Sequence, residues 1–388
     1  MYYQEEIISQ ILNDKNNNIA KLALKANNFH QEGNLYVTKC PFHHGKQEDF
    51  FVNNKTNTWY CPVCGESGNQ ISFIMKLKDY NFENALRFLA KRAKIALPEP
   101  ETVNIDNSVF YDINRDAARF FYKNLTASIG LEYFKKRQLS IDTLIKFRLG
   151  YAPPSKDALY KYLSSLGYQK NVLLKSGLIG ISAKGEYYDK FRNRVMYPII
   201  NQDNKFIGFG GRVLDDSKPK YLNSQATPVF DKKQNLYGFN YAQNTKMNYF
   251  IFCEGFMDTI AMHQAGFDNA VASLGTALTQ EQVALISNYT DNVFLAYDSD
   301  GPGVSAALRA IELFNAKDIT CKIINMAPAK DPDEYIKRFG RESFLERIES
   351  AENSEHFYIR KLKEKYPDEK NKFYEEAIGI LLQKGENN

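Results

Sequence analysis

The sequence predicts a multidomain α/β (α+β) protein with a small metal-binding head, a basic mixed α/β segment, a parallel-sheet core and a helical C-terminal tail. Three observations predict this class. The 388 residues give room for two or three domains at the usual size of roughly 150 residues each. Cysteine and histidine pairs gather near the N-terminus. Beyond Lys246, apolar strand-like runs alternate with helical stretches, which is typical of a parallel sheet.

The composition argues against the membrane and secreted classes of protein. Hydrophobic residues make up 44% and charged residues 25% of the chain, close to the averages of globular proteins. No apolar run approaches the ~20 residues that a membrane helix needs, and the stretch MYYQEEIISQ lacks the basic start and apolar core of a secretory signal. A cytoplasmic protein is therefore expected. Five cysteines are too few for a disulfide framework.

Composition shifts divide the chain into five segments. The stretch LPEPETVNIDNSV combines two prolines with polar residues and interrupts the helical pattern, so it is expected to be a linker. The predicted segments are the head at 1–96, the linker at 97–109, the basic segment at 110–246, the parallel-sheet core at 247–340 and the helical tail at 341–388.

The elements follow from local patterns. In the head, aromatic residues between the two Cys/His pairs predict a small hairpin packed on the metal, and SFIMKLKDYNFENALRFLAKRAKI predicts one or two amphipathic helices. Residues 111–149 are expected to be mostly helical, and residues 194–214 to form short strands. The core predicts strands at YFIFCEG, NAVASLG, NVFLAYDSD and TCKIINM, separated by helices at MDTIAMHQAGF, TQEQVALISNY and VSAALRAIELF.

Charge is unevenly distributed along the chain, although the formal net charge of +4 is too small to identify a partner. Residues 181–246 carry eleven Lys or Arg against six Asp or Glu, whereas residues 247–340 carry six against twelve. A basic segment beside an acidic one is expected where a polyanion and metal ions meet.

The head contains a candidate zinc site. Cys40 and His43 form a C-x2-H pair, and Cys61 and Cys64 form a C-x2-C pair after it. Each short pair can chelate one edge of a tetrahedron, so four such ligands predict structural zinc with no open position for catalysis. The remaining cysteines, Cys253 and Cys321, lie in apolar runs and are expected to be buried as small hydrophobic residues.

Acidic residues follow three apolar runs of the core. They occur in the motifs EGFMD, YDSD and DPD, and the loops at the carboxyl ends of parallel strands converge on one crevice. A single such residue is more often a helix cap or turn former. The set together predicts a site for one or two Mg2+ or Mn2+ ions. Its members are Glu254, Asp258, Asp298, Asp300, Asp331 and Asp333.

The segment before the core carries basic residues among aromatics and glycines. Lys190, Arg192 and Arg194 alternate, which on a strand would place them on one face. Three glycines precede Arg212 in IGFGGRVL, and glycines permit the close approach of a phosphate backbone. The pattern suits a nucleic-acid backbone or a triphosphate, with a solvated basic face as the alternative. Further members of the set are Lys220, Asn223 and Lys232.

Together these motifs resemble the DnaG-type primases of bacteria and phages. CPFH, CPVCG and GN-x-ISFIM come first, followed by LGYAP, YDKFRNRVMYPI, GFGGRVL, PKYLNS and LYGF, and then by EGFMD, AVASLGTALT, YDSD and KDPDEYI. The resemblance extends from about residue 37 to residue 340, and the first forty residues match the family poorly.

The resemblance implies a zinc-ribbon-like N-terminal domain, a basic subdomain and a Toprim core that holds Mg2+ or Mn2+. The implied activity is synthesis of RNA primers from ribonucleoside triphosphates on single-stranded DNA during replication. The six acids named above match the acidic Toprim positions; among them Glu254, Asp298 and Asp300 are the implied catalytic residues, with Glu254 either a proton acceptor or a metal ligand. The implied template- and nucleotide-binding positions are Lys190, Arg192, Arg194, Arg212, Lys220, Asn223 and Lys232.

The chain departs from the family pattern in a few places. Phe256 stands where the family usually has Tyr, and Ser299 where it usually has Gly. The resemblance also implies a replicative helicase as a partner, on which the family docks through a further C-terminal domain. Only about fifty residues follow KDPDEYI, so this domain is expected to be absent or truncated. The alternatives to primer synthesis are a non-catalytic single-stranded-DNA-binding replication factor and a Toprim-type strand-cleaving enzyme.

Overall fold

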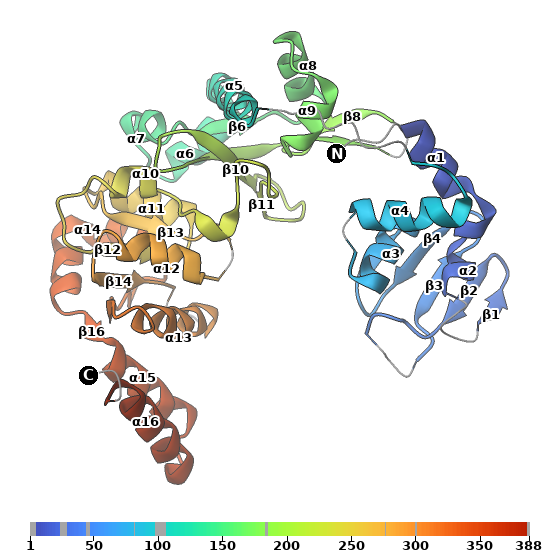
Figure 1. The fold of residues 1–388 in the computed structure, drawn as a ribbon. Coiled ribbons are helices and arrows are strands. Elements are labelled where there is room, and N and C mark those ends of the chain that lie inside the picture. Colours follow the sequence, from blue (N-terminus) through green and yellow to red (C-terminus); the bar gives the residue numbers. More distant parts are fainter. Residues whose placement is uncertain are drawn as a thin grey trace. The chain divides into compact units, whose positions relative to one another are not determined.

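The computed structural model describes residues 5–23, 29–43, 47–80, 82–97, 106–182, 185–275, 277–298 and 301–385, apart from the side chains of Pro302 and of residues 379–385. The chain forms two compact units, residues 1–104 and residues 105–388 (Figure 1). They are called the N-terminal unit and the C-terminal unit below.

The N-terminal unit is built around an antiparallel sheet. It begins with three short helices: α1 (Glu5–Asn13), η1 (Lys15–Asn17) and α2 (Ile19–Ala23). The five strands pair in chain order: β1 (His30–Glu32), β2 (Leu35–Thr38), β3 (Phe50–Asn53), β4 (Thr58–Cys61) and β5 (Glu66–Gly68). Two helices follow the sheet: α3 (Gln70–Lys78) and α4 (Phe82–Ala93).

Aromatic residues form the core between this sheet and α3. Phe50 of β3 and Trp59 of β4 are buried and stacked, with ring centroids 5.5 Å apart, and Phe73 of α3 lies 5.9 Å from Phe50. The side chain of Asn69 accepts the N–H of Ser72 and so caps the start of α3. The predicted hairpin and the two predicted helices are therefore confirmed.

The first half of the C-terminal unit consists of helices and a small antiparallel sheet. Its helices are α5 (Ser108–Leu125), α6 (Ile129–Lys136), α7 (Ile141–Lys146), α8 (Ala158–Ser165), α9 (Lys170–Lys175), η2 (Lys232–Gln234) and α10 (Phe239–Ala242). Its main sheet has the order β11-β10-β9-β6 and comprises β6 (Gly150–Ala152), β9 (Arg194–Ile200), β10 (Phe206–Val213) and β11 (Tyr221–Asn223). A separate hairpin pairs β7 (Ile179–Ile181) with β8 (Tyr187–Asp189).

The second half of the C-terminal unit is a sheet with the order β13-β12-β14-β15-β16. The first four strands are parallel: β12 (Phe250–Cys253), β13 (Ala270–Ala272), β14 (Asn292–Ala296) and β15 (Thr320–Ile323). The connecting helices are α11 (Phe256–Gln264), α12 (Gln280–Ser287), α13 (Gly301–Asn315) and α14 (Pro332–Glu349). The predicted strand and helix alternation is confirmed, and Cys253 and Cys321 are buried as expected.

Both faces of the antiparallel sheet are buried because alternate residues of β9 face different cores. Val195 and Tyr197 pack with Phe256 of α11 in one cluster, whereas Met196 packs with Phe121 of α5 in another. The antiparallel sheet is thus held between α5 and the parallel-sheet half. This packing fixes the basic segment relative to the acidic one.

The end of the chain differs in part from the predicted helical tail. Gly340 interrupts α14 with a φ of 78°, and beyond it Phe344 and Ile348 are buried in the main core. Strand β16 (Glu352–Asn353), which was not predicted, pairs antiparallel with β15. The segment therefore contributes to the core before α15 (Ser354–Lys365) and α16 (Lys370–Gly385) begin.

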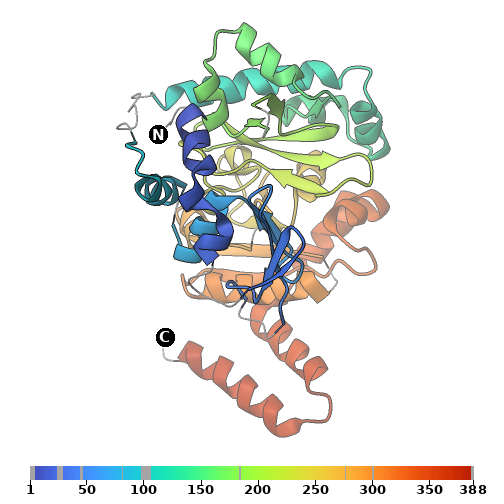
Figure 2. The ribbon, with the colours of Figure 1, turned by 90° about the vertical axis from the view of Figure 1, so that its right-hand side faces the viewer.

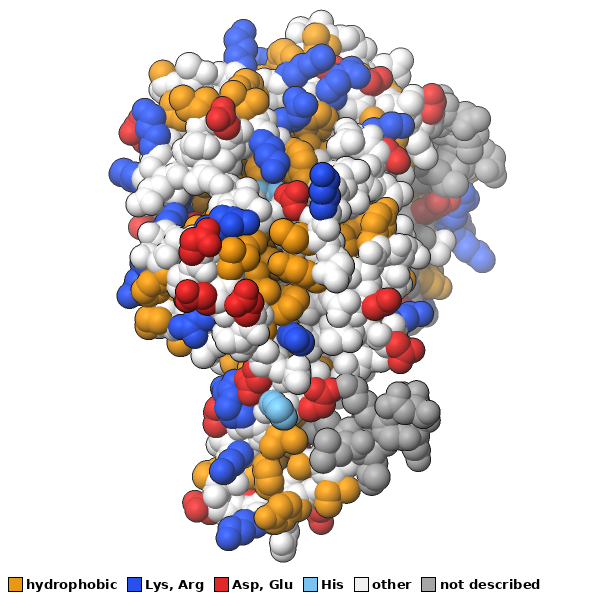
Figure 3. Space-filling view, turned by 90° about the vertical axis from the view of Figure 1, so that its left-hand side faces the viewer, with side chains coloured by type: hydrophobic (Ala, Val, Ile, Leu, Met, Phe, Trp, Pro, Cys, Tyr) orange, Lys and Arg blue, Asp and Glu red, His pale blue; other side chains and the backbone are white. Residues whose placement is uncertain are grey.

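Helices α15 and α16 lie side by side as a hairpin at the end of the C-terminal unit (Figure 2). Tyr374 and Ile378 of α16 are exposed, and hydrophobic side chains are visible on the hairpin in Figure 3. At the other end of the unit, α5 begins at Ser108, two residues inside the predicted linker. The division into five segments is otherwise still a prediction.

Candidate metal centres and nucleic-acid surface

The four predicted zinc ligands lie together. Cys40 follows β2 and Cys61 ends β4, while His43 and Cys64 lie in the turns after them. The Sγ atoms of Cys40 and Cys64 are 3.7 Å apart, and Nδ1 of His43 is 3.0 Å from Sγ of Cys64 and 3.7 Å from Sγ of Cys61. Among the described residues, this is the one group of three or more His, Cys, Asp or Glu side chains arranged to hold a metal ion, and its ligand atoms all lie within 4.8 Å of one another.

The chemistry of this donor set fits zinc. Three thiols and one imidazole at these separations suit a tetrahedral ion and leave no open position. Burial, and then the neighbouring thiols of Cys61 and Cys40, raise the pKa of Cys64 to about 12. Thiolates crowded in this way need a cation between them, which a bound zinc ion supplies. The centre is therefore structural.

Sequence reasoning missed one residue at this centre. Oδ2 of Asp49 lies 3.1 Å from Nε2 of His43, on the side of the ring away from the thiols. Asp49 immediately precedes β3, and a carboxylate six positions after a histidine is too weak a pattern to identify it. The fold of the hairpin brings the two side chains together.

The acidic site forms at the carboxyl ends of two neighbouring parallel strands. Glu254 follows β12 and Asp298 lies just beyond β14, and these strands pair with Cys253 opposite Ala296. Oε1 of Glu254 accepts the backbone N–H of Asp298 at 2.9 Å, which ties the two loops together. The helix that follows can approach closely only because residue 303 is glycine. A Cβ there would lie 2.2 Å from the carbonyl oxygen of Asp298.

Asp258 and Asp331 extend this acidic site. Asp258 lies in the first turn of α11, as expected, and Asp331 caps the N-terminus of α14 by accepting the N–H of Glu334 at 2.8 Å. Burial, and then the charges of Asp331, Asp298 and Asp333, raise the pKa of Asp258 well above its ordinary value. Asp258 therefore lies within electrostatic reach of Asp331, Asp298 and Asp333, and a divalent cation among these carboxylates would relieve their repulsion. Asp300 lies outside the described residues.

Asp333 differs from the other acids because cations of the chain already surround it. Its side chain is 3% exposed and lies 3.1 Å from Nη1 of Arg137, the residue directly after α6, and 2.7 Å from Nζ of Lys337. A second lysine, Lys330, places Nζ 3.5 Å from Oδ2 of Asp298. Sequence reasoning did not identify these three basic residues. KDPDEYIK contains both lysines, but nothing in it points to Arg137.

Replacing Asp258 by Asn is expected to stabilise the metal-free C-terminal unit. A raised pKa in the folded state means that ionisation of this carboxyl opposes folding once the pH rises above its unfolded value of about 4. Asn removes the charge, so the Tm at pH 7 should rise by roughly 2–4 °C for each kcal/mol of relieved repulsion. The gain should shrink as the pH falls toward 4.

Calorimetry in a chelating buffer would measure this effect. Asp291→Asn is the matched control, because it removes the same charge from an exposed residue at the other end of β14. If Asp258→Asn melts no higher than Asp291→Asn at pH 7, the carboxylates do not repel one another as the geometry indicates.

The three alternating basic residues do not share the face of one strand, so that prediction is wrong. Strand β8 ends at Asp189 and β9 begins at Arg194. The chain turns between them, with Asn193 in the left-handed region at a φ of 51°. Lys190 is half-buried and donates to Oε1 of Gln225 at 2.9 Å, whereas Arg192 is exposed.

Arg194 faces inward. It is 6% exposed, and its guanidinium donates to the carbonyl oxygens of Pro219, Gly211 and Lys220 at 2.8, 3.2 and 3.3 Å. The arginine thus donates to one carbonyl group of β10 and to two of the connection between β10 and β11. The geometry is that of a residue that holds the sheet together.

The glycines of β10 serve packing, contrary to the expectation of a phosphate contact. A Cβ at Gly210 would lie 2.4 Å from the ring of Phe256, and a Cβ at Gly211 would lie 2.8 Å from the ring of Phe191. The space beside these glycines is filled by aromatic side chains of the same unit. Glycine is required here so that β10 can pack against α11, where Phe256 also stacks on Tyr197 at 5.1 Å.

The remaining predicted basic and polar positions lie around the antiparallel sheet. Arg212 is half-buried, with Cζ 4.8 Å from the ring centroid of Tyr133 on α6. Lys220 is exposed, and Lys232 opens η2. Nδ2 of Asn223 donates to the carbonyl oxygen of Leu274 at 2.8 Å, which joins β11 to the loop after β13.

Helix α6 brings the basic and acidic parts together. Its Tyr133 contacts Arg212, and Arg137, which caps its C-terminus, forms the ion pair with Asp333. The face of the molecule in Figure 3 shows basic side chains predominating in its upper part and mixed charges below.

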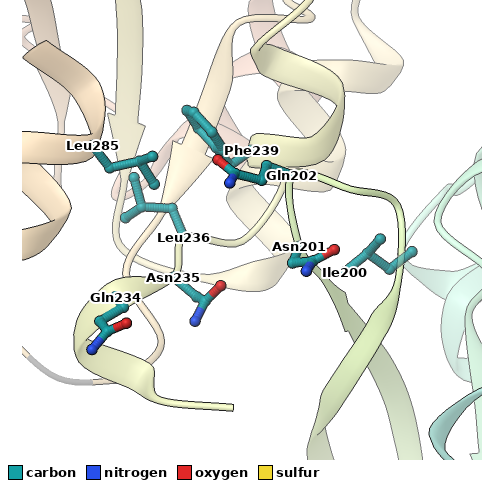
Figure 4. Close-up of a pocket in the computed structure, with 8 residues that line it drawn as sticks. All are labelled: Ile200, Asn201, Gln202, Gln234, Asn235, Leu236, Phe239 and Leu285. Carbon is teal, nitrogen blue, oxygen red and sulfur yellow. The ribbon is translucent and has the colours of Figure 1, made fainter. Parts of the chain in front are cut away.

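A pocket of about 200 Å3 lies elsewhere in the C-terminal unit (Figure 4). Its polar lining consists of side-chain amides, Asn201, Gln202, Gln234 and Asn235, and Phe239 and Leu285 form part of its apolar lining. It shares no lining residue with the acidic or basic sets and has no charged side chain. It does not suit a triphosphate.

The fold and the two centres define the class of protein. A parallel sheet with acids at the ends of adjacent strands, a packed antiparallel sheet that carries basic residues, and a separate Cys3His centre together describe a zinc-ribbon and Toprim protein of nucleic-acid metabolism. Family models agree: CHC2 zinc finger over residues 3–104, DNA primase catalytic core, N-terminal domain, over 120–243, and Toprim-like over 251–336. The first match corrects the expectation that the first forty residues match the family poorly.

The chain belongs to the DnaG-type primase family. It is similar to the DNA primase of Clostridium acetobutylicum, with 40% identity over 89% of this chain and 59% of that protein, and to the DNA primase of Haemophilus influenzae, with 35% identity over 85% and 58%. The chain thus spans between half and three fifths of the curated relatives it matches. Among the described residues, no helix has the length and apolar character needed to cross a membrane.

Solved structures show the same relationship. The zinc-binding and RNA polymerase domains of the Aquifex aeolicus primase are 31% identical, with a TM-score of 0.62 over 98% of this chain and 93% of that one. A DnaG primase catalytic domain bound to single-stranded DNA is 33% identical, with a TM-score of 0.61 over 67% of this chain and 84% of that one.

Proposed function

We propose that this protein synthesises short RNA primers from ribonucleoside triphosphates on a single-stranded DNA template, in the cytoplasm of a bacterial or phage-infected cell. The observation that carries the proposal is the acidic site, where Glu254 and Asp298 from adjacent strands are joined by a hydrogen bond and Asp258 and Asp331 lie close by. Family membership supports it, because the curated relatives are DNA primases.

The residues divide the work of nucleotidyl transfer. Glu254, Asp258, Asp298 and Asp331 would hold Mg2+ or Mn2+, which when bound neutralises the triphosphate and favours ionisation of the primer 3′-hydroxyl. The backbone N–H of Asp298 fixes the orientation of the Glu254 carboxylate. We place Asp300 in the same set because of its motif. We assign Asp333 a positioning role, since Arg137 and Lys337 already neutralise it.

Basic residues would bind the polyanionic substrates. Arg192 and Lys220 are exposed and would contact template phosphates, and the guanidinium of Arg212 packs against the rings of Tyr133 and Tyr221. Lys190, Asn223 and Lys232 are half-buried and belong to the same half of the C-terminal unit, which contains the antiparallel sheet. Arg194 supports this surface from within. The RNA product and, by family resemblance, a replicative helicase complete the proposed partners.

Ribonucleotide incorporation on mixed-sequence single-stranded DNA, with Mg2+ or Mn2+, tests the proposal. Short alkali-labile products are the expected result. DNA binding without any RNA product under either metal would contradict it and favour the non-catalytic replication factor. Nicking or relaxation of supercoiled DNA by the same preparation would favour the strand-cleaving alternative.

Arg192→Ala and Arg194→Ala are expected to act differently although the residues are two positions apart. Loss of the exposed Arg192 should weaken DNA binding and reduce the slope of log K against log salt by about 1, with an unchanged Tm. Loss of the buried Arg194 removes a donor from three carbonyl groups, of which that of Lys220 still accepts the N–H of Val213. The cost is on the order of 1–3 kcal/mol for each group left unsatisfied and buried. The Tm of this variant should fall.

Fluorescence anisotropy at several salt concentrations and a thermal melt would separate the two effects. The matched pair is its own control, since each variant removes one arginine. An Arg194→Ala chain with a native Tm would contradict the structural role.

A further inference from the structure

His43 lies between the thiols of the zinc centre and a carboxylate. Its Nδ1 is 3.0 Å from Sγ of Cys64 and 3.7 Å from Sγ of Cys61, so this nitrogen is the one that can bind zinc. Its Nε2 is 3.1 Å from Oδ2 of Asp49. Because the two nitrogens of an imidazole point in different directions, Asp49 contacts the ligand without being a ligand itself.

The carboxylate of Asp49 is mostly buried, and His43 is its hydrogen-bond partner among the described side chains. Its side chain is 12% exposed, and its Oδ1 is buried with no hydrogen-bond partner among the described residues. A buried carboxylate is costly unless it is hydrogen-bonded or paired. The Nε2–H of His43 is the donor in contact with it, so the two groups are matched only when that nitrogen carries the proton.

The adjacent carboxylate does not share this position. Oε2 of Glu48 lies 3.0 Å from Nδ1 of His30, and both side chains are about half exposed. Glu48 and Asp49 therefore have the same charge, but only Asp49 contacts a zinc ligand. Comparing substitutions at these two positions separates the effect of this contact from the effect of net charge.

We propose that Asp49 is a positioning residue of the zinc centre. It accepts the Nε2–H of His43, fixes the neutral tautomer whose Nδ1 lone pair faces the thiols, and strengthens that nitrogen as a zinc ligand. Carboxylates hydrogen-bonded to a ligating histidine act in this way and typically contribute 10–100-fold to metal affinity. The proposal rests on the zinc centre and not on primer synthesis.

The rate of zinc release from the whole zinc-loaded chain into an excess of a chromophoric chelator tests this role. Asp49→Asn should release zinc on the order of 10–100-fold faster than the native chain. Glu48→Gln, the matched control, should release it at the native rate. Asp49→Glu keeps a carboxylate and should restore slow release at least in part. Native release from Asp49→Asn, or equally fast release from Glu48→Gln, would overturn the proposal.

A second measurement separates positioning from a general loss of structure. In 15N-labelled, zinc-loaded protein, the Nε2 proton of His43 should exchange slowly with solvent in the native and Asp49→Glu chains and rapidly in Asp49→Asn. Fast zinc release with an equally protected Nε2 proton would overturn the proposal. If Asp49→Asn does not fold, the Asp49→Glu chain provides the test. Rapid exchange of the Nε2 proton of His43 in that variant would overturn the proposal. Neither readout requires RNA synthesis, so failure of the proposed function would leave this result unaffected.

Discussion

Replacing Asp298 by Asn is expected to lower ribonucleotide incorporation by on the order of 10²–10³-fold, the range typical when one electrostatic contribution to the transition state is lost. Asp298 lies at the end of β14 beside Glu254. The negative charge of its carboxylate is one of those that raise the pKa of Asp258. The amide keeps the shape of the side chain and removes the charge that a divalent cation needs. The double replacement of Asp298 and Asp300 by Ala should abolish synthesis.

DNA binding should persist in both variants, since the exposed basic residues lie in the antiparallel half. Asp291→Asn, at the amino end of the same strand, should synthesise RNA at the native rate. Gel analysis of products and anisotropy of labelled single-stranded DNA would be made on the same preparations. Undiminished synthesis by Asp298→Asn would remove the basis for assigning a catalytic cation to this edge of the sheet.

Replacing Cys61 by Ser should release zinc and loosen the N-terminal unit while the C-terminal unit stays folded. Cys61 is fully buried at the end of β4, and the hydroxyl of serine is a poor substitute for a thiolate. Binding of structural zinc contributes about 10–16 kcal/mol in isolated zinc-finger peptides, so losing one ligand removes much of what orders the hairpin. Zinc content per chain and hydrogen exchange resolved by region would measure both effects.

The two units should respond separately because their apolar cores are separate. The core that contains Phe50, Trp59 and Leu86 lies wholly within residues 1–104, and the other three clusters lie wholly beyond residue 105. Cys321→Ala is the control, since it removes a buried thiol from β15 and should leave the zinc content native. A Cys61→Ser chain that retains a full complement of zinc would show that the ligand set is wrong.

Local patterns in the sequence were sufficient for much of the fold. The C-x2-H and C-x2-C pairs predicted the zinc ligands because short-range chelation depends on spacing alone. Alternating apolar strands and helices predicted the parallel sheet, and parallel strands place residues such as Glu254 and Asp298 at one edge by geometry. These features require no knowledge of which distant segment packs where.

The tertiary structure decided how charged and small residues are used. Arg192 and Arg194 look alike in the sequence. In the structure Arg192 is exposed, whereas Arg194 is buried and donates to carbonyl groups of the connection between β10 and β11. The glycines of β10 could have faced a phosphate, but aromatic rings fill the space beside them.

The same holds for the partners of the two centres. Asp333 pairs with Arg137, at the end of α6 in the other half of the unit, and Asp49 contacts His43, six positions earlier in the chain. By itself the sequence determined the parallel strands of the core, the zinc ligands and the edge at which the acids gather, because backbone periodicity and ligand spacing are local. The folded chain decided which charges face solvent, which are paired and which orient a ligand. Burial and Coulomb interactions depend on distance in space, and only folding brings distant segments together.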